Sequence, residues 1–246
     1  MSSAAPQPAR RRNAWRGLFL LLVLLVGGGI AWAYLVPRPP SETAVPVSPT
    51  PTPTPTPTIP EIARQQVWTS DAVSSGEYRL NTTAIDSGTA NARMIDYVVK
   101  VESTVDIDAD EAAREIQAVF DDPRGWAGYG RTSFRAVTAE TEDTLAIYLA
   151  APDSAQTLCA PLDIERKWNC RNGNDVVLNT DRWLYMTPTY DDLAMYRAYL
   201  VNHEVGHFLG QGHVACPAEG RAAPVMMQQS IELDGCVPNA WPREAD

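Results

Sequence analysis

Apolar and polar residues follow two different spacings along the C-terminal three quarters of the chain. Residues 93–102 are rich in β-branched and aromatic side chains, which predicts a strand. A helix is expected next, because the sequence from Asp108 to Glu111 resembles a capping box. Apolar residues follow at helical spacing up to Asp122-Pro123, where the helix is expected to end: Ala112, Ile116, Val119 and Phe120.

Further strands are predicted at residues 133–138, 144–150 and 175–179. A second long helix is expected after Asp191, which can cap its N-terminus. Its apolar face is formed by residues spaced three and four apart that lead directly into two histidines: Leu193, Tyr196, Leu200, His203 and His207. Strands together with two long helices predict an α+β fold, although periodicity does not set the order of the strands.

The N-terminal part of the chain has a different pattern. Residues 17–36 carry no charge and are about as long as a helix that crosses a bilayer. Residues 1–16 include four arginines and only Arg38 follows the apolar segment closely, so the positive-inside rule predicts a cytoplasmic tail and a single-pass anchor in the cell membrane. The alternative is a signal peptide cleaved after Ala31-Trp32-Ala33. The apolar run continues past that site to Val36, which favours a retained anchor.

Residues 37–60 are predicted to be a stalk. Proline and threonine alternate from Pro49 to Thr58, and such a sequence is extended and semi-rigid rather than globular. The composition becomes globular in residues 61–246, which are long enough for one domain with its own core. With the predicted orientation, this domain is extracellular.

Charge and cysteine usage restrict the environment of this domain. The chain has 20 basic and 30 acidic residues, a net charge of −10 and a pI near 4.8, which argues against nucleic acid as a partner. Its four cysteines show no Cys-x-x-Cys spacing: Cys159, Cys170, Cys216 and Cys236. An even number in an oxidising compartment favours two disulfides, and of the three pairings we expect the sequential one. Free buried thiols are the alternative.

The three histidines of the chain all lie within a short stretch, in a pattern that favours a metal site. On a helix, His203 and His207 lie one turn apart on the same face, so both imidazoles can reach one ion. Glu204 is close enough to take a proton from water at that ion. Gly210 can adopt a left-handed backbone that turns the chain and brings in His213. Three protein ligands leave a fourth zinc position open, as in catalytic sites.

This pattern resembles the signature of the metzincin zinc peptidases, which also have a downstream methionine turn. Residues 223–228 provide such a turn, in which Met226 is the favoured floor of the site and Met227 the alternative. Some metzincins have a tyrosine at the position of Gln228, so the group that stabilises the tetrahedral intermediate is open. The anchor, stalk and domain together also resemble an uncharacterised family of membrane-anchored, metzincin-like proteins of high-GC bacteria.

The resemblance implies a mixed sheet with an active-site helix, a bound Zn²⁺ and an endopeptidase that acts on peptides or proteins. Glu204 would be the catalytic base, and Asn202 and Gln211 could support the ligands, although surface exposure is equally compatible with their positions. Two alternatives share the site: a zinc-stabilised binding or scaffold domain without turnover, and a zinc amidase that acts on cell-wall peptides. The sequence does not identify the natural substrate.

Overall fold

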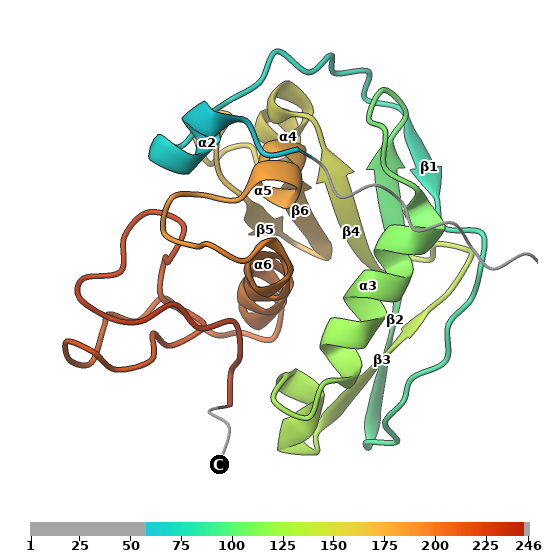
Figure 1. Ribbon diagram of the computed structural model, residues 1–246. Helices are drawn as coiled ribbons and strands as arrows, with labels where there is room; N and C mark the ends of the chain where they lie inside the picture. The colour runs from blue at the N-terminus through green and yellow to red at the C-terminus, as the bar shows by residue number, and fades with distance from the viewer. Residues whose placement is uncertain (1–57, 244–246) are drawn as a thin grey trace, which may run out of the picture. The chain divides into compact units, whose positions relative to one another are not determined.

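The computed structural model describes residues 58–243, which all belong to one compact unit (Figure 1). The predicted cytoplasmic tail, the apolar segment 17–36 and nearly all of the stalk lie outside the described residues. Within residues 58–243, no helix combines the length and the apolar character needed to cross a bilayer.

A six-stranded mixed sheet forms the centre of the domain. The strands are β1 (Tyr78–Leu80), β2 (Arg93–Glu102), β3 (Thr132–Ala136), β4 (Leu145–Ala150), β5 (Cys170–Asn172) and β6 (Asp175–Asn179). Their order is β1-β2-β4-β6-β5, and β3 also pairs with β2. Strands β2, β3, β4 and β6 are parallel, whereas β1 and β5 are antiparallel to their neighbours. The predicted α+β class and the mixed sheet are therefore confirmed.

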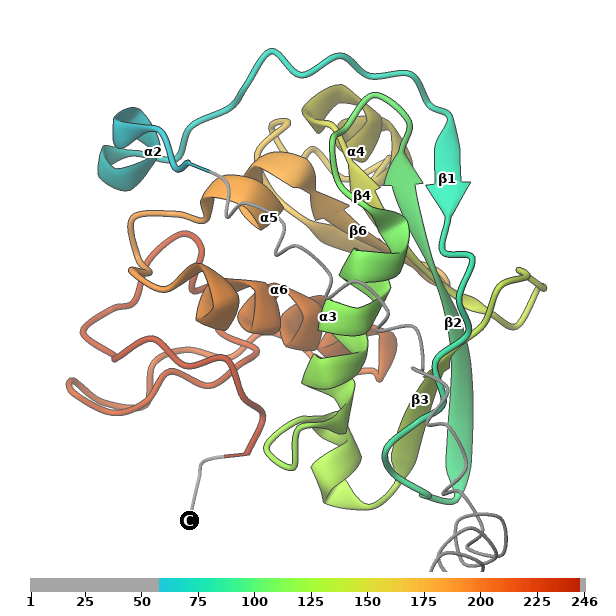
Figure 2. The ribbon, with the colours of Figure 1, turned by 45° about the vertical axis from the view of Figure 1, so that its right-hand side comes forward.

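The helices are α2 (Glu61–Gln65), α3 (Ala109–Asp121), η1 (Trp126–Tyr129), α4 (Pro152–Leu158), α5 (Thr180–Tyr185) and α6 (Leu193–Phe208). Helices α3 and α6 lie together on one face of the sheet (Figures 1 and 2). Alternate residues of β2 separate the two faces: Tyr97 and Val99 pack in the core with α3 and α6, and Val98 packs in a second cluster with α4. Burial on both faces explains the continuous apolar runs in the parallel strands.

Helix α6 is the element that carries the first two histidines. It begins one residue later than predicted, because the side chain of Asp192, not Asp191, accepts a hydrogen bond from the backbone N–H of Met195. Almost every residue from Tyr196 to Gly206 is buried, so packing fixes the orientation of the helix. Gly210 has φ +88°, the left-handed conformation expected to turn the chain after the helix.

The chain after α6 contains no helix or strand among the described residues and is held by other bonds. A disulfide joins Cys216 to Cys236, the backbone N–H of Ala223 donates to the carbonyl of Val237, and that of Val237 donates to the carbonyl of Arg221. The second disulfide joins Cys159 at the end of α4 to Cys170 in β5. The sequential pairing is therefore confirmed, and free thiols are excluded for these four cysteines.

The segment before β1 is bonded to α5 and to the sheet through two buried acidic residues. Asp181 at the start of α5 accepts hydrogen bonds from the backbone N–H and the hydroxyl of Ser70, both at 2.7 Å. Glu102 at the end of β2 accepts from the backbone N–H groups of Gly76 and Ala151. Each carboxylate is satisfied by several donors, which makes its burial tolerable.

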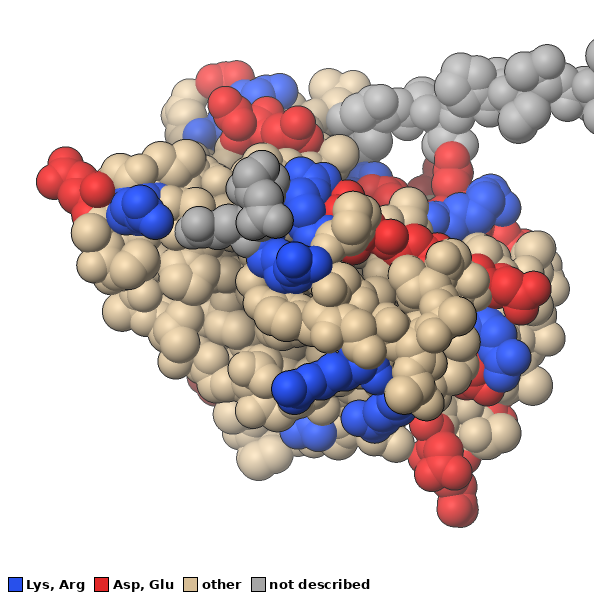
Figure 3. Space-filling model, turned by 90° about the horizontal axis from the view of Figure 1, so that it is seen from below, with Lys and Arg blue, Asp and Glu red and all other residues tan. Residues whose placement is uncertain are grey.

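The surface seen from below carries basic and acidic side chains interspersed among uncharged residues (Figure 3). The positive charges on this face do not form one continuous area.

Candidate metal centre

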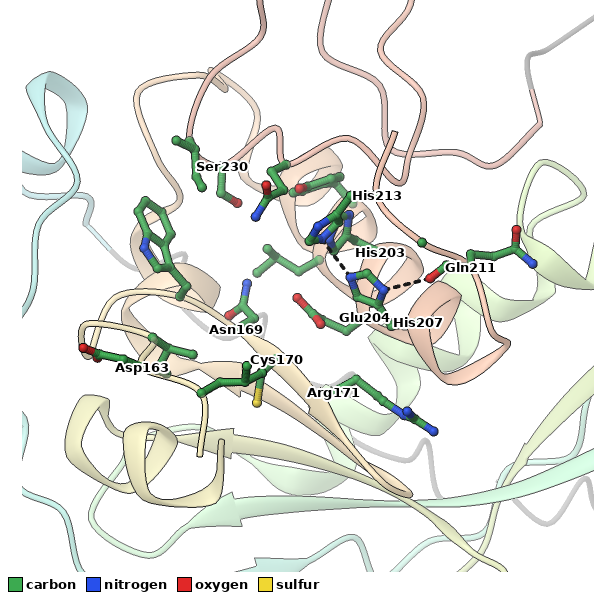
Figure 4. A pocket seen from close by; sticks show the side chains of 18 of the residues that line it. Asp163, Asn169, Cys170, Arg171, His203, Glu204, His207, Gln211, His213 and Ser230 are labelled. Carbon is green, nitrogen blue, oxygen red and sulfur yellow. Dashed lines mark hydrogen bonds between the residues drawn. The ribbon is translucent and has the colours of Figure 1, made fainter. Parts of the chain in front are cut away.

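The structure brings the three histidines together. His203 and His207 project from α6, and His213 reaches them from the loop that follows Gly210 (Figure 4). One nitrogen from each ring lies within 4.8 Å of the others, and the Nε2 atoms of His207 and His213 are 3.0 Å apart. This group of residues could hold a metal ion.

Hydrogen bonds to backbone carbonyl groups fix the orientation of two of the imidazole rings. The Nδ1 atom of His203 donates to the carbonyl of Val225 at 2.8 Å, and Nδ1 of His207 donates to the carbonyl of Gln211 at 2.9 Å. A carbonyl oxygen can only accept, so Nδ1 carries a proton in both rings, and in the neutral form of each ring Nε2 keeps its lone pair. Gln211 thus supports a ligand through its main chain, while its side chain is exposed.

Burial favours the neutral forms that bind metal. It lowers the pKa of His203 to about 3, with a smaller effect from the neighbouring histidines, and it lowers the pKa of His213 as well. Neutral imidazole is the form that coordinates a cation.

Glu204 is only 5% exposed and faces the same space (Figure 4). Burial raises its pKa to about 8, because the ionised carboxylate loses its hydration. No hydrogen bond to its carboxylate is found among the described residues. A cation held by the histidines would favour the ionised form and would lower this pKa.

Met226 rather than Met227 lies beneath the histidine helix. Its sulfur occupies the space where a Cβ atom on Gly206 would lie, and the ring of Trp126 approaches the same point at 2.9 Å. Met227 packs instead in a small cluster with Ala223 and Cys236. Gly206 is thus the residue that permits close contact between the helix and this turn.

Two tyrosines of α6, which sequence analysis did not single out as supporting residues, hold the methionine turn. The hydroxyl of Tyr199 donates to the carbonyl of Met227 at 3.0 Å and accepts from the backbone N–H of Gln229 at 2.9 Å. The hydroxyl of Tyr196 is 2.8 Å from that of Ser230. A buried tyrosine hydroxyl needs a partner, which was the available signal in the sequence.

Asn202 was considered as a support for the metal ligands, but its hydrogen bonds are made elsewhere. It is fully buried, and its side-chain amide donates to the carbonyl of Ala240 at 3.0 Å. Its backbone carbonyl accepts from the indole N–H of Trp126. Asn202 therefore joins α6 to η1 and the C-terminal segment, and no hydrogen bond links its side chain to a histidine within residues 58–243.

The histidines and Glu204 open onto a cavity of about 620 Å³. The loop between Cys159 and Cys170 and the first residues of β5 form one wall, and the segment after Met227 forms another. Large apolar side chains lie exposed on both walls, with Leu162 56% and Ile231 49% exposed. These walls were not predicted from the sequence, since they come from short segments without a clear period. Their residues include Leu162, Ile164, Trp168, Asn169, Arg171 and Ile231.

The sequence model of the family described as "Protein of unknown function (DUF3152)" matches residues 68–241. Comparison with curated proteins found no match, and comparison with solved structures found none either. The matched segment covers more than half of the chain and includes the three histidines, Glu204, Met226 and all four cysteines. The chain therefore belongs to the DUF3152 family.

Proposed function

We propose that this protein is a zinc-dependent endopeptidase of the metzincin type. The observation that carries the proposal is the arrangement of three imidazoles and one buried carboxylate around an open cavity. A purely structural zinc site has four protein ligands and needs no cavity or buried base beside it.

The donor set fits zinc. His203, His207 and His213 would supply three nitrogen ligands and leave one coordination position for water or substrate. When bound, zinc supplies a Lewis acid that polarises a carbonyl group and makes water more acidic. The carbonyl groups of Val225 and Gln211 keep Nε2 of the first two rings available.

Glu204 would move the proton. A buried carboxylate with no hydrogen-bond partner among residues 58–243 is, once ionised, a good acceptor for a proton from the attacking water. It would then pass this proton to the nitrogen of the cleaved peptide bond, so that one group acts first as base and then as acid.

The free edge of β5 supports a peptide as substrate. Among the described residues β5 pairs only with β6, and Cys170 and Arg171 line the cavity. An extended peptide can form backbone hydrogen bonds with such an edge, while its side chains contact the cavity walls. The exposed side chains of Leu162 and Ile231 would favour apolar residues there.

The proposed location is the outer surface of the cell membrane, with residues 17–36 as the anchor and residues 37–60 as the stalk. The two disulfides are consistent with an oxidising compartment.

The test uses the detergent-solubilised full chain and a broad peptide library. We expect one zinc per chain, and cleavage that is lost on chelation and recovered when zinc is added. Glu204→Gln should keep zinc and lose at least about 10²-fold in turnover, whereas His207→Ala should lose both.

Each other outcome would contradict the proposal or favour a different explanation. Wild-type protein prepared without chelator that contains no zinc would contradict the proposal. Full zinc occupancy without cleavage of any peptide would favour the scaffold domain, and cleavage of crosslinked wall fragments alone would favour the amidase. Equal hydrolysis by wild type and Glu204→Gln would indicate a contaminating protease or another base.

A further inference from the structure

Asn169 places a fixed amide group in the cavity. It directly precedes β5, between the partly buried Trp168 and the disulfide-bonded Cys170. Antiparallel pairing of β5 with β6 and the disulfide hold this part of the chain. Its position is therefore set by the sheet and not by a free loop.

One hydrogen bond determines how the amide is oriented. The side-chain oxygen Oδ1 of Asn169 accepts from the backbone N–H of Asn179 at 2.9 Å. A backbone N–H can only donate, so the atom facing Asn179 must be the oxygen and the amide cannot be reversed. The NH₂ group points the other way, and no acceptor for it is found within residues 58–243.

The side chain of Asn169 shares one cavity with the candidate metal ligands. Asn169 lines the same cavity as Glu204 and the three histidines, and its side chain reaches into that cavity from the β5 side, toward Glu204 (Figure 4). Two other polar side chains of the cavity are engaged elsewhere: Ser230 bonds with Tyr196 and the hydroxyl of Tyr199 bonds with the methionine turn. Asn169 thus offers an oriented donor without a partner.

We propose that Asn169 is a further catalytic residue, whose amide donates a hydrogen bond to the oxygen that becomes negatively charged during peptide hydrolysis. The inference rests on the proposed function and extends it. Water oxygen bonds to the carbonyl carbon, the carbonyl π electrons move to oxygen, and Glu204 takes the proton. The C=O bond then re-forms as the C–N bond breaks, and Glu204 returns the proton to nitrogen.

Two substitutions test this role together. Asn169→Asp keeps the oxygen that accepts from Asn179 but removes the NH₂ donor, so the fold should be unchanged. Asn169→Ala removes the donor without adding charge. We expect both to lower kcat by about 10²- to 10³-fold, the usual effect of removing one such donor, with KM changed only a few-fold. Asn174→Ala is the matched control, because Asn174 is exposed outside the cavity and donates only to the carbonyl of Glu142.

A second measurement does not depend on turnover. The probe is a phosphinic peptide that replaces the cleaved amide of the best library substrate with a tetrahedral group. Both variants should bind it at least about 10-fold more weakly than wild type by calorimetry, with zinc content unchanged. Wild-type rates in both variants would overturn the proposal. A loss of activity in Asn169→Asp alone would also overturn it, because that loss would come from the added negative charge and not from the missing donor. Absence of cleavage by wild type would instead contradict the proposed function.

Discussion

At the scale of single residues, close contact between α6 and the methionine turn depends on Gly206. The side chains of Met226 and Trp126 fill the space where a side chain at this position would lie. Any side chain at this position would push the turn away from the helix. The turn also carries Val225, whose carbonyl orients His203.

Gly206→Ala is therefore expected to destabilise the fold by roughly 1–3 kcal/mol, the usual cost of overpacking, and to weaken zinc binding. Thermal melting with chelator present measures the fold, and zinc titration measures the site. Gly212→Ala is the control for stability, because a Cβ there meets no atom within 4 Å. Equal melting temperatures for the two variants would show that the turn adjusts without strain.

The residues that sequence reasoning identified have a periodic or paired signature. The spacing of three and four residues predicted that His203 and His207 share a face, and the structure also brings His213 to them. Asn169 and Tyr199 have no such signature. The role of each depends on a hydrogen-bond partner that is distant in the sequence. Asn169 accepts from the backbone N–H of Asn179 and Tyr199 donates to the carbonyl of Met227, and only the fold shows these partners.

At the scale of elements, long segments were predicted well and short ones were missed. The strand predicted at 93–102 and the one at 175–179 match β2 and β6, and Asp108 caps α3 as expected. The three-residue strands β1 and β5 and the helix α4 are too short to show a period. They form because tertiary neighbours complete their hydrogen bonds and burial. Since β5 borders the cavity, the wall of the site was the part least accessible to sequence analysis.

The two disulfides should have separate local effects. Replacing Cys159 and Cys170 together by alanine is expected to lower the free energy of unfolding by about 2–4 kcal/mol and to speed hydrogen exchange in residues 160–172. Replacing Cys216 and Cys236 should cost a similar amount but should affect the segment after His213. The measurements are denaturant unfolding and exchange mass spectrometry. Unchanged exchange near β5 in the first variant would mean that strand pairing alone holds this wall.

At the scale of the whole molecule, the predicted organisation has four parts, and the structure describes nearly all of the last one. Protease added to intact cells, or to spheroplasts, should cut between Pro49 and Thr58 and release the folded domain, because the stalk has no core to protect it. Immunoblotting of the supernatant detects the released fragment. Protection until the membrane is permeabilised would mean the opposite orientation, and mature chains that begin at Tyr34 would support a cleaved signal peptide.

The buried carboxylates of Asp181 and Glu102 have a mechanical consequence. Tension that reaches residue 68 would meet the bond from Arg182 to the carbonyl of Trp68, and then the bonds from Ser70 to Asp181 and from Gly76 to Glu102. These bonds pass the load into the start of α5 and the end of β2, next to strands with many neighbours in the sheet. Among the described residues no hydrogen bond joins α6 to residues 68–76 directly, and α6 is joined to α5 through Arg197 and the carbonyl of Trp183. Pulling or shearing at the N-terminal side would therefore strain the sheet before it disturbed the spacing of the three histidines.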